Sequence, residues 1–115
     1  MLPWLPAAGD VICLATDGVL DNLFDSQLAE LLSGGGDATA LANGVASRAR
    51  KVSLSRTAET PFSVSAAAAG FRVRGGKVDD IAVVVIRVLA AVDQPADEFS
   101  TPVVILPAPP PRSKM

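Results

Sequence analysis

The sequence contains no histidine and only one cysteine, Cys13, and aromatic residues make up 4% of the chain. Without histidine, the chain cannot use Ser-His or Cys-His catalysis, and it cannot bind zinc through imidazole. A single cysteine forms neither a disulfide framework nor a zinc site, so Cys13 is predicted to be a reduced, buried thiol. The core must be built from alanine, valine, leucine and isoleucine.

Basic charge and long apolar runs are also scarce. The net charge is −2 and the isoelectric point is near 4.9. We therefore expect the chain to bind neither nucleic acid nor an anionic membrane surface. The longest apolar run, 81–92, is too short to span a bilayer and contains Arg87. The first ten residues carry none of the basic residues of a signal or transit peptide.

The 115 residues are enough for one domain with a modest core, and local patterns predict its elements. Apolar runs bounded by glycine and aspartate predict buried strands at 11–16 and at 81–86 or 81–89. Helical spacing predicts a helix over 26–32 capped by Asp25, and a second helix capped by Asp37 that ends near Val52. A third helix is predicted from Thr60-Pro61 to Gly70.

Residues 93–115 differ in composition, because they hold most of the prolines together with acidic residues and serine. We therefore predict a tail without fixed structure, in which Val103–Leu106 is the one stretch able to add a strand. The segment "PAPPPR" could dock in an aromatic-lined groove, but a disordered end is the favoured interpretation. Arg48, Arg50 and Lys51 are interpreted as a solvated helix end rather than as a phosphate site.

Acidic residues stand where the two predicted strands meet solvent. Asp17 follows the first strand, and Asp79-Asp80 precede the second. If the strands are antiparallel neighbours, Asp17 and Asp79 converge at one edge of the sheet, where they could bind Mg²⁺ or Mn²⁺ through oxygen. Pattern alone leaves open the alternative that both are turn residues or caps.

Nearby acidic and amide side chains have a simpler interpretation. Asp21, Asn22 and Asp25 are predicted to be turn and capping residues.

Two other motifs fail at specific residues. "ATDGVLDN" is similar to the D-x-D-G-V-L box of haloacid-dehalogenase-type phosphatases, but Ala15 replaces the nucleophilic aspartate of that family and cannot form an aspartyl-phosphate. An EF-hand is excluded because Gly18 comes too early in the loop and no glutamate closes it.

Three segments together resemble the metal-dependent protein phosphatases of type 2C. They are "GDVICLATDGVLDN", "TPF" at 60–62 and "GFRVRGGKVDDIAVVVI", and their order and spacing make the match specific over roughly residues 9–88. The Gly-Gly-Lys followed by Asp-Asp-Ile is similar to the branch found in mitochondria and plastids, which suggests one of those locations.

The resemblance implies an α+β fold, a partial β-sandwich flanked by helices, of which residues 9–92 form the C-terminal half. Residues 1–8 would be an N-terminal extension, and 93–115 the tail. Asp17 and Asp79 match the family's metal ligands, with Asp80 a neighbour and Lys77 given no catalytic role. The implied activity is hydrolysis of phosphoserine or phosphothreonine in a phosphoprotein by a metal-bridged water, with no side-chain nucleophile.

The family's first Asp-Gly pair and its phosphate-binding arginine have no counterpart in this sequence. We therefore expect little or no phosphatase activity from the 115-residue chain alone. The alternative function is a non-catalytic binding module that uses its sheet edge or its tail. A partner that completes the half-domain is also expected.

Overall fold

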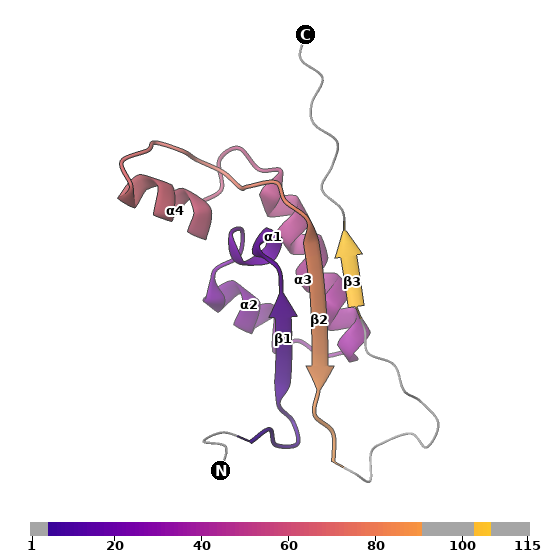
Figure 1. Ribbon diagram of the computed structural model, residues 1–115. Helices are drawn as coiled ribbons and strands as arrows, with labels where there is room; N and C mark the ends of the chain where they lie inside the picture. The colour runs from indigo at the N-terminus through magenta and orange to yellow at the C-terminus, as the bar shows by residue number, and fades with distance from the viewer. Residues whose placement is uncertain (1–4, 91–102, 107–115) are drawn as a thin grey trace.

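The computed structural model describes residues 5–90 and 103–106 and contains one three-stranded antiparallel sheet (Figure 1). Its strands are β1 (Val11–Ala15), β2 (Ile81–Arg87) and β3 (Val103–Leu106), in the order β1-β2-β3. The first two strands pair antiparallel, as the convergence of Asp17 and Asp79 requires, with Cys13 opposite Val85. The central strand, β2, therefore forms hydrogen bonds on both of its edges.

The two faces of β2 differ in exposure because side chains alternate along a strand. Ile81, Val83 and Val85 are buried on the inner face. On the outer face Leu14 and Ile86 are 59% and 39% exposed, although both are large and apolar. The predicted α+β class is confirmed, and within the described ranges α1 and α3 pack against β2.

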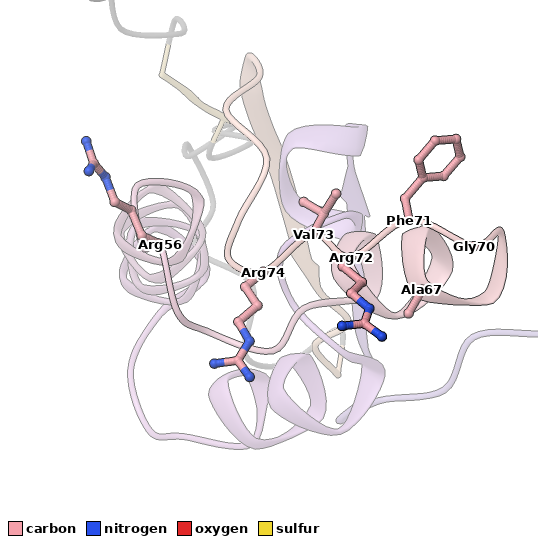
Figure 2. Close-up of a pocket in the computed structure, with 7 residues that line it drawn as sticks. All are labelled: Arg56, Ala67, Gly70, Phe71, Arg72, Val73 and Arg74. Atoms are coloured by element: carbon pink, nitrogen blue, oxygen red, sulfur yellow. The ribbon is translucent and has the colours of Figure 1, made fainter.

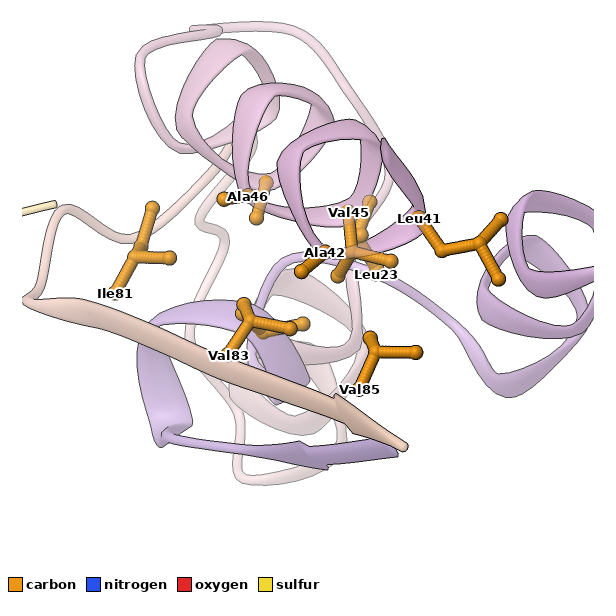
Figure 3. Packing of buried hydrophobic residues seen from close by; sticks show 10 residues of the cluster. Leu23, Leu41, Ala42, Val45, Ala46, Ile81, Val83 and Val85 are labelled. Atoms are coloured by element: carbon orange, nitrogen blue, oxygen red, sulfur yellow. The ribbon is translucent and has the colours of Figure 1, made fainter. Parts of the chain in front are cut away.

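The longest helix, α3 (Ala38–Ser53), covers the inner face of the sheet (Figure 3). Asp37 caps it as predicted, with its carboxylate accepting a 2.8 Å hydrogen bond from the Ala40 amide. Its buried stripe packs against the three inward side chains of β2 and against α1 (Asp17–Leu20); this stripe consists of Leu41, Ala42, Val45, Ala46 and Ala49. The core is small and aliphatic, as the composition predicted.

Two further helices follow the predicted pattern with small differences. Helix α2 (Asp25–Leu32) begins one residue earlier than expected, so Asp25 is its first residue and not its cap. The cap position is Phe24, whose backbone N–H donates to the side chain of Gln27 at 2.8 Å. Helix α4 (Pro61–Ala68) begins after Thr60, whose hydroxyl accepts from the Ser63 amide at 3.0 Å.

The prediction of an unstructured tail is wrong for Val103–Leu106, which form β3 and pair with Ile81–Val84 of β2. The rest of that predicted tail, apart from these four residues, lies outside the described residues, as does most of the predicted N-terminal extension. None of the helices in the described ranges is long and apolar enough to cross a membrane.

Candidate metal-binding edge of the sheet

Thr16 joins the two strands at the acidic end of the sheet. Its amide donates to the carbonyl of Ala82 at 3.1 Å, which continues the β1–β2 ladder by one residue. Its hydroxyl donates to the Asp80 carbonyl at 3.0 Å and accepts from the Ala82 amide at 3.0 Å. The hydroxyl therefore fixes the end of β1, just before Asp17, against the start of β2, just after Asp79.

Gly18 brings the two acidic segments into direct contact. It is buried, and a methyl group added there would collide with the carbonyl group of Asp80. Only glycine lets the backbone after Asp17 approach the backbone after Asp79 this closely. Asp17 and Gly18 form the first turn of α1, so Asp17 is the first residue of a helix.

Asn22 holds the segment before Asp79 in place. It is completely buried, and its side-chain amide donates to the carbonyls of Gly18 and Lys77, each at 2.8 Å. Its side-chain oxygen accepts from the Lys77 amide, also at 2.8 Å. The predicted role as a turn or capping residue describes only the Gly18 bond, because the other two join segments 55 positions apart.

The glycine pair before Lys77 fits tightly against its surroundings. Gly75 has φ +93, a conformation that favours glycine, and its carbonyl accepts from the buried Thr60 hydroxyl at 2.8 Å. A methyl group at Gly76 would collide with the backbone carbonyl of Val52 in α3. The loop that leads to Asp79 is therefore fixed against both α3 and the N-terminus of α4.

Lys77 lies beside this loop on the surface. Its ammonium group is 3.7 Å from a carboxylate oxygen of Asp21 and 5.6 Å from the centre of the Phe62 ring. An exposed ion pair of this kind contributes little to stability.

Asp17 and Asp79 are both exposed at this edge, and the Asp79 carboxylate accepts a 2.8 Å hydrogen bond from the amide of Asp80. Two carboxylates offer oxygen donors suited to a hard cation such as Mg²⁺, which retains several waters in protein sites. Among the described residues, no group of three or more acidic, histidine or cysteine side chains is placed to hold a metal ion.

Cys13 is not part of this edge. It lies in the middle of β1, is half-buried rather than fully buried, and forms no disulfide. Burial raises the pKa of its thiol, so it is a poor nucleophile near neutral pH.

The comparisons with known proteins agree with this fold. No family model matches the chain. A relative from Arabidopsis thaliana named "Probable protein phosphatase 2C 55" is 39% identical over 92 residues, which cover 76% of this chain and 20% of the relative. The relative from Drosophila ananassae named "Protein phosphatase PTC7 homolog fig" is 41% identical over 96 residues, which cover 77% of this chain and 28% of the relative.

A solved structure shows the same arrangement. The X-ray structure of the photosystem II phosphatase PBCP matches with a TM-score of 0.66 and 31% identity, over 72% of this chain and 37% of that one. The chain belongs to the protein phosphatase 2C family. It spans about a fifth to three tenths of the length of the two curated relatives described above.

Proposed function

We propose that this chain contributes part of the metal site of a protein serine/threonine phosphatase, with Asp17 and Asp79 as ligands for Mg²⁺ or Mn²⁺. The observation that supports it is the shared edge, where Thr16 and Gly18 hold the backbone after Asp17 against the backbone before β2. Membership of the protein phosphatase 2C family supports a divalent metal dependence and a phosphoprotein substrate.

The residues present fit such a cation. Both candidate ligands are carboxylates at an exposed edge, which leaves room for the waters that Mg²⁺ retains. A bound divalent cation would supply Lewis-acid stabilisation of the negative charge on a phosphoryl group. Around it, the buried Asn22 fixes the approach to Asp79, and the Thr16 hydroxyl fixes the spacing between the two strand ends.

The proposal is tested by Mn²⁺ binding to the full chain, measured by titration calorimetry and by the loss of the free-ion electron paramagnetic resonance signal. Asp17→Asn and Asp79→Asn should each weaken binding at least ~10-fold, because loss of an outer-shell partner alone typically costs about 10–100-fold. Asp25→Asn is the matched control, since Asp25 is exposed at the start of α2. Unchanged binding in both site variants, or an equal loss in the control, would contradict the proposed ligands.

A second candidate function, a non-catalytic binding module, is favoured by one observation. The outer face of the sheet exposes Leu14 and Ile86, and a partner that packs there would complete the half-domain. The two functions are distinguished by the same titration, because a binding module of this kind needs no cation at Asp17 and Asp79.

A further inference from the structure

An open groove of about 780 Å³ lies between the end of α4 and the turn after α3 (Figure 2). Its lining includes Arg56, Arg72 and Arg74 together with two apolar side chains, Phe71 and Val73. We call this feature the arginine groove. It lies apart from the acidic edge of the sheet, and no residue is common to the two.

One wall of the groove, Phe71–Arg74, is held firmly at both ends. At one end Gly70 has φ +94 and its amide donates to the Ala67 carbonyl at 3.0 Å, while the Phe71 amide donates to the Ala66 carbonyl at 2.8 Å. These two bonds form a Schellman motif that ends α4. At the other end the Gly75 amide donates to the carbonyl of Ala58 at 3.0 Å.

Between these anchors the backbone is free to form hydrogen bonds. Within the described ranges, no hydrogen bond joins the backbone groups of Arg72, Val73 or Arg74 to another residue. Exposed, unpaired backbone amides and carbonyls can pair with an added strand.

Side chains on this wall alternate in direction and in chemistry. Arg72 and Arg74 point to one side of the segment, and Phe71 and Val73 point to the other (Figure 2). Phe71 and Val73 are 64% and 39% exposed. In a β-sheet, side chains that alternate with a period of two contact the matching side chains of a neighbouring strand in cross-strand pairs.

Charge determines which strand fits. The groove lining holds no acidic residue, although the whole chain has a net charge of −2. Within the described ranges, none of the groove's three arginines forms an ion pair. Glu59 lines a neighbouring hollow that shares Ala67, Val73 and Arg74 with the groove.

We propose that the arginine groove binds an extended polypeptide segment of a partner protein in which acidic and apolar residues alternate. The segment pairs with the backbone of Arg72–Arg74. Its carboxylates face Arg72 and Arg74, and its apolar side chains cover Phe71 and Val73. Binding requires no metal ion, so the inference is independent of the proposed phosphatase function.

The test uses fluorescence anisotropy with the full chain in the presence of a chelator. The probe is a labelled peptide of alternating glutamate and valine, compared with a peptide of the same composition in two blocks. The alternating peptide should bind at least ~10-fold more tightly, because only it places every carboxylate on the arginine side. Its binding should weaken as the salt concentration rises, and amide hydrogen exchange of Arg72–Arg74 should slow when it binds.

The variant Arg72→Glu, Arg74→Glu should weaken binding at least ~10-fold, because repulsion replaces a charge-assisted contact at two positions. The matched control is Arg48→Glu, Lys51→Glu, which makes the same charge change on the exposed side of α3, away from the groove. Equal binding of the two peptides, or an equal loss in both variants, overturns the proposal. Tighter binding of single-stranded RNA or of anionic lipid vesicles, lost in the groove variant, also overturns it by assigning the groove to another partner class.

Discussion

Replacing Asn22 by alanine should destabilise the protein more than the small size of the asparagine side chain suggests. Three hydrogen bonds are lost, and the buried Gly18 carbonyl together with the carbonyl and amide of Lys77 lose their partners. Each such bond contributes about 0.5–1.5 kcal/mol net, so we expect a loss of about 3 kcal/mol in the free energy of unfolding. Domains of this size are stable by only about 5–15 kcal/mol.

The loss is measured by urea unfolding of the full chain, followed by circular dichroism at 222 nm. Asn43→Ala is the matched control, because Asn43 is exposed on α3 and its loss should change stability by less than about 0.5 kcal/mol. Asn22→Asp is a second variant with the same shape, which retains an acceptor for the Lys77 amide but removes both donors to the Gly18 and Lys77 carbonyls.

Asn22→Asp should be at least as damaging as Asn22→Ala, because a buried carboxylate would face two carbonyl oxygens. A loss of less than about 1 kcal/mol for Asn22→Ala, with an unchanged slope of the unfolding free energy against urea concentration, would refute this role of Asn22. An Asn22→Asp variant as stable as the parent chain would refute it as well. Either result would show that the three bonds do not hold the segment before Asp79.

Two further predictions concern other positions. Gly18→Ala should destabilise the chain by about 1–3 kcal/mol or more, because the added methyl group meets the backbone of Asp80. Gly44→Ala in α3 should instead stabilise the chain by about 0.5–1 kcal/mol, because no atom lies within 4 Å of the added methyl group. Thermal unfolding of both variants measures the difference, and equal effects would contradict the contact between Gly18 and Asp80. Burial raises the pKa of the Cys13 thiol, so its rate of alkylation by iodoacetamide should increase with pH around a midpoint pH that is higher than for a free cysteine peptide. A midpoint pH at or below that of the peptide would contradict the effect of burial.

Local signals were sufficient to predict most of the helices and two of the strands. The Asp37 cap and the Thr60-Pro61 start each depend on hydrogen bonds within one turn, so neighbouring residues determine them. The antiparallel pairing of β1 with β2 was a supposition, from which the convergence of the acidic residues at the two strand ends followed. The structure confirms the pairing, while the bound cation remains a proposal.

The features that were missed depend on contacts between distant segments. The pattern "LDNLF" gives no sign that Asn22 is buried, because its partner at Lys77 is 55 positions away. Val103–Leu106 was recognised as able to add a strand, but the prolines around it favoured an unstructured tail, because this strand depends on its pairing with β2. The four-residue helix α1 is too short for periodicity to show. The arginine groove was not predicted, although "FRVR" alternates with a period of two and lies within one of the segments that carry the family resemblance.

The position of β1 at the start of the sheet has a consequence for synthesis on the ribosome. Ala15 pairs with Val83, which is 68 positions later in the chain. At about 5–20 residues per second, β1 would emerge and wait roughly 3–14 s before its partner strand is made. During that interval Val11–Ala15 lack β2, their partner strand within the described ranges, so the nascent chain offers a binding segment to chaperones well before this pair of strands can form.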